Sequence, residues 1–242
     1  MPDLSSTSPL AVAVTEAIRT GNVTALKQLL AEYPELATTR ILDARCNGGG
    51  ARTLLHVATD WPGSFPKGAE TVAALVAAGA DVNATFGGAH TETPLHWAAS
   101  CDDVAVLDML LDSGANIEAP GAVIAGGTPL ADAVAFGQWQ AARRLVERGA
   151  QANLWQAAAL GLMDRVKNYV TATPPPPTEE ITKAFWLACH GGQQPAAEYL
   201  LERGANINWV GYDDLTPLDT ARRSEATDLV EWLESRGAKS AK

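Results

Sequence analysis

Two short motifs recur along this chain of 242 residues at one shared interval. The tripeptide Thr-Pro-Leu begins at Thr93 and again at Thr128, which is 35 residues later, and it returns at Thr216. A Gly-Ala or Gly-Ala-like pair begins at Gly79, Gly114 and Gly149, in steps of 35 residues, and later at Gly204 and Gly237. Because two independent motifs share one period, the sequence predicts a chain of repeats in which each repeat stacks on the next.

Each repeat is predicted to form two short helices. Thr93 suits the N-cap of the first helix, and Pro94 suits its first helical position. The apolar residues over 104–111 predict the second helix, and Gly114 can adopt the left-handed conformation that ends it. Helices this short are unstable alone, so each is expected to bury its apolar side against neighbouring repeats.

The repeat that begins at Thr93 carries the most complete motif. Residues 93–98 read Thr-Pro-Leu-His-Trp-Ala, and the second helix ends in Leu-Leu, followed by Gly114 and Ala115. This pattern resembles the ankyrin-repeat signature, and about seven degenerate copies cover almost the whole chain. They are centred on residues 17–30, 54–79, 93–114, 128–149, 154–170, 184–204 and 216–237. The resemblance implies an all-α ankyrin-repeat solenoid of paired antiparallel helices with β-hairpin-like fingers, forming a single domain over residues 1–242.

The copies depart from the family pattern in the loops. The second repeat carries an inserted segment over 62–66, and the connectors 84–92 and 120–127 are about two residues longer than the family spacing. No finger is expected after Asn153, where the next helix begins directly. Four prolines at 174–177 predict a stiff polyproline-II spacer. This spacer is interpreted as an irregularity at 171–178, and the alternative is a domain boundary that separates residues 1–173 from 178–242.

Charge and cysteine content restrict the partners and the compartment. The formal net charge of -10 disfavours nucleic acid and anionic membranes as partners. Cys46, Cys101 and Cys189 form no Cys-x-x-Cys pair, which favours a reducing compartment. The first residues lack a basic segment before an apolar run, so neither a signal peptide nor a membrane span is expected. The prediction is a cytoplasmic protein.

The resemblance also implies a working surface, formed by the ends of the first helices and by the fingers. Carried over position by position, it predicts these binding residues: Asp60, Trp61, Phe86, His90, Glu92, Cys101, Phe136, His190, Trp209, Tyr212, Asp213 and Asp214. The aromatic members offer the flat apolar faces that dominate protein interfaces. The acidic members favour a cationic partner. The predicted function is therefore a protein-binding module with an acidic, aromatic-lined concave groove, whose partner is another protein that presents a basic segment.

Four ring-bearing residues are expected to serve the fold. In the family, the histidine that follows Pro-Leu hydrogen-bonds loop backbone between repeats, and this role is carried over to His56 and His96. Trp155 and Trp186 are assigned to the same position in their own repeats, as packing substitutes.

No enzymatic activity, cofactor or metal site is predicted. The sequence has no phosphate-binding loop, dinucleotide fingerprint or His-Glu-x-x-His motif, and its histidines and cysteines lack ligand spacing. The alternative function is a small-molecule-binding protein or a non-standard enzyme, with a closed pocket under the fingers near Asp60, His90 and Cys101. Any chemistry of His90, Cys101 and His190 stays open at this point.

Overall fold

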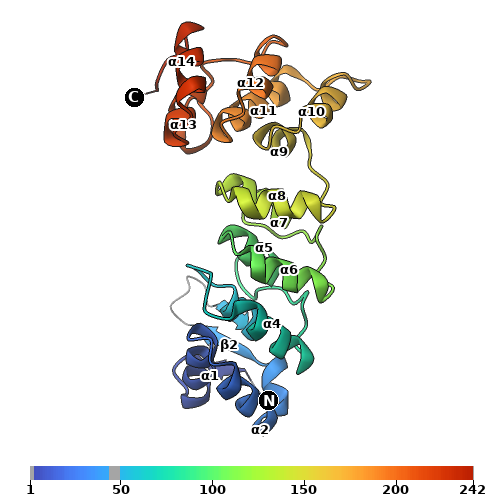
Figure 1. Cartoon of the computed structure of the whole chain (residues 1–242), viewed down its shortest axis with the longest axis vertical. Coiled ribbons are helices and arrows are strands. Elements are labelled where there is room, and N and C mark those ends of the chain that lie inside the picture. The colour runs from blue at the N-terminus through green and yellow to red at the C-terminus, as the bar shows by residue number, and fades with distance from the viewer. Residues whose placement is uncertain (1–2, 44–49, 242) are drawn as a thin grey trace. The chain divides into compact units, whose positions relative to one another are not determined.

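The computed structural model describes residues 3–43 and 50–241, so Cys46 lies outside the described residues. The chain divides into two compact units, residues 1–150 and 151–242 (Figure 1). The single domain over residues 1–242 remains a prediction. Among the described residues, no helix is both long enough and apolar enough to cross a membrane.

The first compact unit is built from four pairs of short helices. Its helices are α1 Pro9–Arg19, α2 Val23–Glu32, α3 Leu54–Ala58, α4 Gly68–Ala77, α5 Pro94–Ser100, α6 Val104–Asp112, α7 Pro129–Ala135 and α8 Trp139–Glu147, with a 3-10 turn η1 at Pro34–Thr38. The first helices of successive pairs pack on one another (α1 on α3, α3 on α5, α5 on α7), and so do the second helices (α2 on α4, α4 on α6, α6 on α8). Two parallel layers result, as the repeat pattern predicts.

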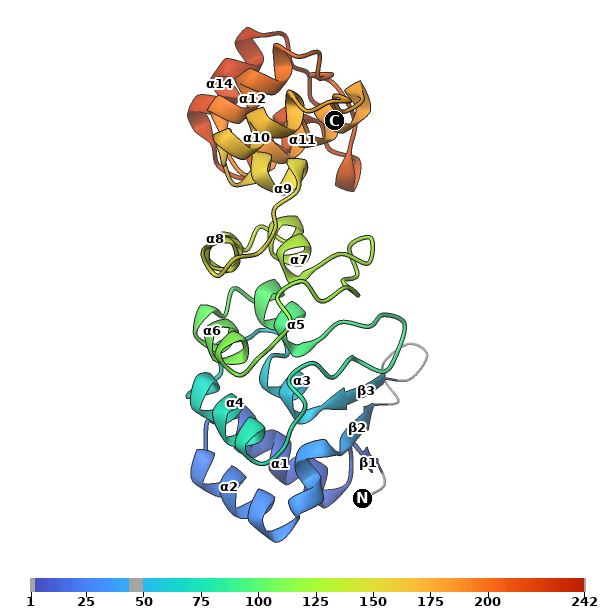
Figure 2. The same ribbon diagram turned by 90° about the vertical axis from the view of Figure 1, so that its right-hand side faces the viewer.

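A small sheet joins the first two repeats. Strand β2 (Arg40–Asp43) pairs antiparallel with β3 (Gly50–Thr53), with Ile41 opposite Arg52, and forms the expected hairpin finger (Figure 2). Strand β1 (Leu4–Ser5) adds a parallel edge strand on β2. A bridge from Ala51 to Gly87 connects this sheet to the next finger. The sequence did not predict β1, because two residues carry no alternating pattern.

The second compact unit continues the paired-helix pattern. Its helices are α9 Leu154–Ala159, α10 Met163–Val170, α11 Thr178–His190, α12 Gln194–Leu201, α13 Pro217–Arg223 and α14 Thr227–Ser235, with a 3-10 turn η2 at Tyr212–Asp214. Helix α11 packs on α9, α12 and α13. Helix α9 begins directly after Asn153, which confirms that the finger is missing there. The proline segment at 174–177 lies inside this unit, between α10 and α11.

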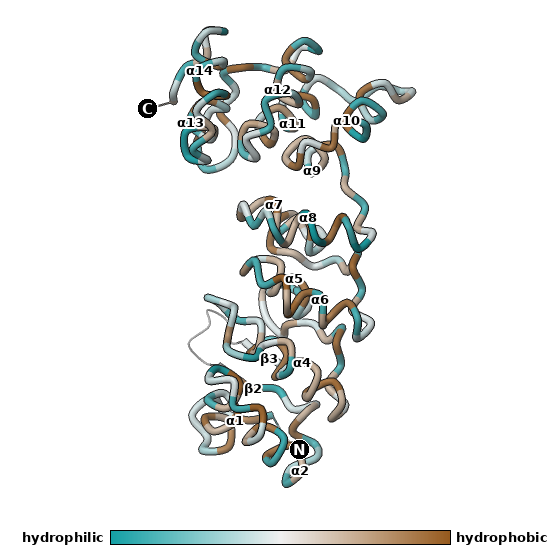
Figure 3. The backbone as a smooth tube through the Cα atoms, viewed as in Figure 1, coloured by the Kyte–Doolittle hydropathy of each residue, from teal (hydrophilic) through white to brown (hydrophobic). Residues whose placement is uncertain are grey.

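The core follows the helix layers. Leu95, Leu107, Leu110 and Leu130 are completely buried, and Figure 3 shows hydrophobic residues (brown) recurring along the helices of both units. Burying one such side chain contributes about 1.5–3 kcal/mol. The predicted caps are also confirmed, since Thr93 caps α5 with Pro94 at its first position, and Gly114 follows α6 with a φ of 91°.

The side chain at one equivalent position, in the first helix of several repeats, forms a hydrogen bond to the next repeat. His96 Nδ1 accepts from the Thr93 amide at 3.0 Å, so its Nε2 carries the proton and donates to the Gly127 carbonyl at 3.3 Å. His56 Nε2 lies 3.1 Å from the Glu92 carbonyl in the same way. Both predicted structural roles are therefore confirmed.

Two tryptophans were assigned to this position, and the structure separates them. The indole Nε1 of Trp186 donates to the Leu215 carbonyl at 2.8 Å and replaces the histidine bond. Trp155 lies in the same register, seven residues before the N-cap of the following helix, as do His96 and Trp186. The capping contact of α9 comes from the next residue, Gln156, which forms a capping box with Asn153.

Candidate functional site

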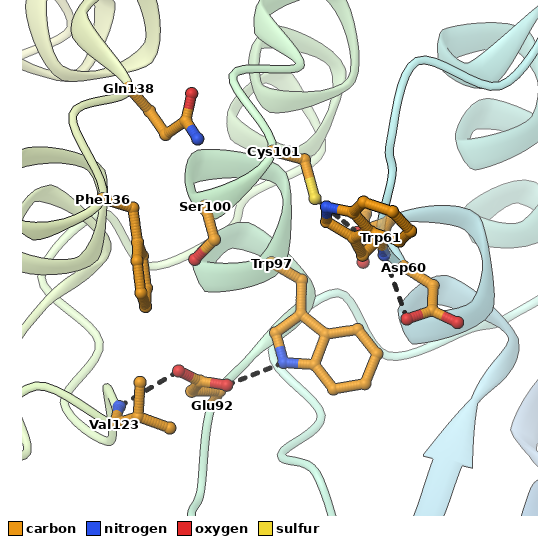
Figure 4. Close-up of a pocket in the computed structure, with 10 residues that line it drawn as sticks. Asp60, Trp61, Glu92, Trp97, Ser100, Cys101, Val123, Phe136 and Gln138 are labelled. Carbon is orange, nitrogen blue, oxygen red and sulfur yellow. Dashed lines mark hydrogen bonds between the residues drawn. The ribbon is translucent and has the colours of Figure 1, made fainter.

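A pocket of about 420 Å³ opens on the first compact unit, where the ends of α3, α5 and α7 meet two fingers. It is lined by Thr59, Asp60, Trp61, Glu92, Trp97, Ser100, Cys101, Val123, Phe136 and Gln138 (Figure 4). Five predicted site residues therefore lie around one hollow. Four follow the first helices of their repeats (Asp60, Trp61, Cys101 and Phe136), and Glu92 comes from a finger. The sequence could place them on one surface because they occupy equivalent positions in successive repeats.

Aromatic rings form the walls of this pocket. The side chain of Trp61 is 79% exposed and that of Phe136 is 49% exposed, whereas Trp97 is half-buried. In the view of Figure 4, Trp61 and Trp97 lie to one side and Phe136 to the other, with Ser100 and Glu92 between them. Large exposed rings are unusual on a surface that touches nothing, and they mark a region suited to binding.

The inserted segment of the second repeat holds Trp61 in place. Asp60 accepts hydrogen bonds from the amide of Trp61, at 3.0 Å through Oδ1, and from the amide of Gly63, at 2.8 Å through its carbonyl. The amide of Ser64 donates to Asp103 Oδ2 at 2.9 Å, which ties the segment to the N-cap of α6. Gly63 has a φ of 76° and backs onto the side chain of Cys101, where a larger residue would collide. The insertion therefore follows directly on Trp61 and packs behind Cys101, both of which line the pocket.

Glu92 was predicted at an exposed finger tip, and the structure corrects this. The residue is only 5% exposed, because its finger folds back onto α5. Its carbonyl accepts from His56 and from the amide of Phe86, at 2.7 Å for the latter. Its carboxylate accepts from Trp97 Nε1 at 2.8 Å and from the amide of Val123 at 3.0 Å. The structural histidine thus fixes the backbone that aims this carboxylate at the pocket.

A second buried acid lies against Glu92 and was missed by the sequence prediction. Asp132 on α7 is completely buried, and its two carboxyl oxygens accept no hydrogen bond. Burial raises its pKa to about 8, with a further contribution from the Glu92 charge. At neutral pH, Asp132 is therefore protonated beside the Glu92 carboxylate. The available signal was an acid within the apolar run Pro-Leu-Ala-Asp-Ala-Val-Ala of residues 129–135.

Asp60 lines the pocket but does not carry a free charge. Its Oδ2 pairs with Arg19 at 2.9 Å and with Arg52 at 2.8 Å. Two guanidinium groups on one carboxylate leave little negative field for a ligand. The field expected from Asp60 is therefore weaker than the sequence suggested.

Cys101 is poorly suited to nucleophilic chemistry. Its thiol is half-buried, and Sγ donates to the Thr59 carbonyl at 3.8 Å. Burial, followed by the charges of Asp60 and Asp103, raises its pKa to about 11. At neutral pH the residue remains a thiol, which is a weak nucleophile.

Phe86 and His90 were predicted on the exposed surface, and the structure places them in the finger packing instead. Phe86 is buried, and its ring stacks on that of His90 with centroids 4.6 Å apart. His90 Nδ1 lies 3.0 Å from Glu92 Oε2, and its ring lines a separate hollow between the fingers, with Thr91, Gly121 and Ala122 among the other lining residues. The alternative pocket near Asp60, His90 and Cys101 is therefore divided between two hollows. Both are open to the surface, whereas the alternative required a closed cavity.

The remaining predicted residues belong to the second compact unit. His190 is buried rather than exposed, because its ring packs beside Trp186, with centroids 5.6 Å apart, and its carbonyl accepts from Ser224. Tyr212 is 52% exposed and meets the half-buried Trp209 edge-on, with centroids 6.0 Å apart. Asp213 pairs with Arg223 at 2.7 Å, and Asp214 is exposed. Trp209, Tyr212, Asp213 and Asp214 form an aromatic and acidic surface on this unit.

Trp97 and Val123 also line the pocket, and Trp97 was not predicted. Trp97 is the variable residue of the Thr-Pro-Leu-His-x-Ala motif, where the family pattern specifies no side chain. Val123 reaches the pocket through the longer finger. Among residues 3–43 and 50–241, no group of three or more His, Cys, Asp or Glu side chains could hold a metal ion.

Comparisons with known proteins point to one family. Residues 68–154 match the family model described as ankyrin repeats (3 copies), and residues 184–212 match the model of a single ankyrin repeat. An ankyrin repeat and KH domain-containing protein of Caenorhabditis briggsae is 31% identical over 185 residues, which cover 73% of this chain and 7% of that protein. The crystal structure of the human ASB11 ankyrin repeat domain aligns with a TM-score of 0.53 at 21% identity, over 93% of this chain and 97% of that one. This last likeness supports the fold alone.

Proposed function

We propose, from the premise that the chain is an ankyrin-repeat protein, that it binds another protein through the aromatic pocket of its first compact unit. Ankyrin repeats generally mediate protein–protein interaction, and proteins built from them are typically non-enzymatic binding modules. The observation that carries the proposal is the 79% exposure of Trp61, held by the inserted segment beside a pocket of about 420 Å³. The cytoplasmic location remains a prediction.

The side chains around the pocket suit a protein partner. Trp61 and Phe136 present apolar area that a partner can cover, and tryptophan is among the residues most enriched at the energetic centre of interfaces. Val123, on a finger, extends the same apolar surface, since its side chain is 50% exposed. Apolar walls with two carboxylates, of which Asp60 is already paired with arginines, fit the anatomy of an interface, in which few polar groups set orientation.

The test compares wild-type protein with the Trp61→Ala variant as bait for proteins from a lysate of the producing cells. Removing a central tryptophan costs about 2 kcal/mol or more, so the captured partner is expected to bind roughly thirty-fold more weakly. The variant should keep its fold, because Trp61 is largely exposed.

The control is Val12→Ala, which removes an exposed apolar side chain of α1 that does not line the pocket. Quantitative mass spectrometry of the captured proteins should show the partner depleted for Trp61→Ala only. Equal capture by all three baits contradicts the proposal. The variant Trp209→Ala, used as a further bait, tests whether the aromatic surface of the second compact unit also contributes to partner capture.

A small molecule in the same pocket is the second candidate. The volume of about 420 Å³ favours it, because ligand pockets span about 300–1,000 Å³. Native mass spectrometry of the protein purified from its own cells tests this function, since a retained ligand adds a discrete mass that Trp61→Ala loses. Protein binding is preferred because the pocket walls are exposed rather than enclosed.

A further inference from the structure

The buried carboxylate of the pocket has no strong cation beside it. Among residues 3–43 and 50–241, no lysine or arginine pairs with Glu92, and its one ion-pair partner is His90 at 3.0 Å. His90 belongs to the neighbouring hollow and does not line the pocket. The contrast with Asp60 is direct, because that carboxylate is held by Arg19 and Arg52. A negative charge that is 5% exposed and faces a hollow favours a cationic occupant.

The aromatic walls favour the same kind of occupant. Trp61, Trp97 and Phe136 line the hollow together with Glu92 (Figure 4). The electron-rich faces of aromatic rings attract a cation, and tryptophan attracts it most strongly. Their apolar surface can also cover the methylene groups that carry such a charge. One pocket therefore offers both a buried anion and faces for an alkyl chain.

We propose that this pocket receives the side chain of a lysine from the partner protein, with its ammonium group next to Glu92 and its methylene groups between the aromatic walls. The proposal rests on the proposed function, since the lysine belongs to the bound partner. The basic segment of the partner would then contribute one lysine, and Glu92 is the carboxylate that binds it.

The hydrogen bonds of Glu92 favour an ammonium group over a guanidinium group. A carboxylate has about four sites that accept hydrogen bonds. Trp97 and Val123 occupy one site each, and His90 Nδ1, which lies 3.0 Å from Oε2, covers a third. Arginine binds carboxylates best through two parallel bonds, which need two open sites. Lysine is a compact charge and needs only one.

The experiment uses the full chain and three short peptides. The probes are acetyl-Ala-Lys-Ala-amide, the same peptide with norleucine, which has the alkyl chain but no ammonium group, and the same peptide with arginine. Binding is followed by NMR through the indole N–H signal of Trp97, whose Nε1 donates to Glu92. The lysine peptide should shift this signal and bind at least about tenfold more tightly than the norleucine peptide, with the arginine peptide weaker than lysine. Norleucine binding as tightly as lysine, arginine binding more tightly than lysine, or an unmoved signal with the lysine peptide overturns the proposal.

Variants locate the charge that the lysine recognises. Glu92→Gln should weaken binding of the lysine peptide about tenfold and leave the norleucine peptide unchanged. Its matched control is Glu70→Gln, which removes the same charge from an exposed position on α4 outside the pocket and should change neither. An equal loss in both glutamine variants overturns the proposal. If Glu92→Gln does not fold, Phe136→Leu takes its place, because that exposed ring can be removed safely and its loss should lower the preference for lysine.

Failure of this inference is distinguishable from failure of the proposed function. If the lysine peptide is not preferred but Trp61→Ala still loses the captured partner, the lysine proposal is contradicted and protein binding through the pocket is retained. Capture that is unaffected by Trp61→Ala contradicts protein binding through this pocket whichever peptide binds.

Discussion

At the scale of single residues, Asp132 gives the sharpest expectation. Its pKa is raised from 3.8 to about 8, chiefly by burial. Between these two pH values, the folded chain keeps a proton that the unfolded chain has lost, so the free energy of unfolding falls as the pH rises. Asp132→Asn removes this dependence. The stability of the variant relative to wild type should therefore increase from pH 5 to pH 8, by up to about 1.4 kcal/mol per pH unit, in urea unfolding experiments.

Asp108 provides the matched control. This aspartate on α6 pairs with Arg144 and Arg148 at 2.8 Å and 2.7 Å, and these partners lower its pKa despite partial burial. It is ionised in both states above pH 5, so Asp108→Asn should change the stability by a constant amount from pH 5 to pH 8. A flat difference for Asp132→Asn over the same range would show that Asp132 is ionised in the folded protein.

At the scale of helices, hydrogen bonds from His56, His96 and Trp186 join neighbouring helix pairs. Because a tryptophan makes this bond in one repeat and a histidine in two others, the presence of a donor matters more than the residue type. Trp186→Phe keeps the ring against His190 and Tyr212 but removes the bond to the Leu215 carbonyl. The free energy of unfolding should fall by about 1 kcal/mol, because the Leu215 carbonyl loses one of its two donors and keeps the Gly211 amide. Trp232→Phe on α14 is the control, since its indole nitrogen makes no hydrogen bond within the described part of the chain. Equal losses in the two variants would assign the effect to ring packing.

At the scale of the whole chain, the sequence predicted the repeats because their signals are local. Thr93, Pro94 and Gly114 act through caps that each helix forms for itself. The cap of α9 could not be predicted in this way, because its repeat lacks Thr-Pro-Leu and Asn153 with Gln156 forms the cap instead. The helix-end members of the pocket also followed from the repeat register.

The fingers could not be predicted in this way. Glu92 and Phe86 are buried because their finger folds onto α5, and burial of His190 depends on Trp186 and α13. These contacts join segments that are distant in sequence, so no local pattern encodes them. Asp132 was missed for the same reason, since its pKa depends on burial within the folded chain and on the Glu92 carboxylate of a finger.

The central claim is that a partner protein contacts the pocket around Trp61, and site-specific photo-crosslinking tests it most directly. The chain is produced in its own cells with p-benzoylphenylalanine in place of Trp61, or in place of Val12 as the control, because both positions are exposed. Irradiation is followed by electrophoresis and mass spectrometry of the adducts. A discrete protein adduct from position 61 that is missing from position 12 is the predicted result. No adduct from position 61, or the same adduct from both positions, would contradict the account.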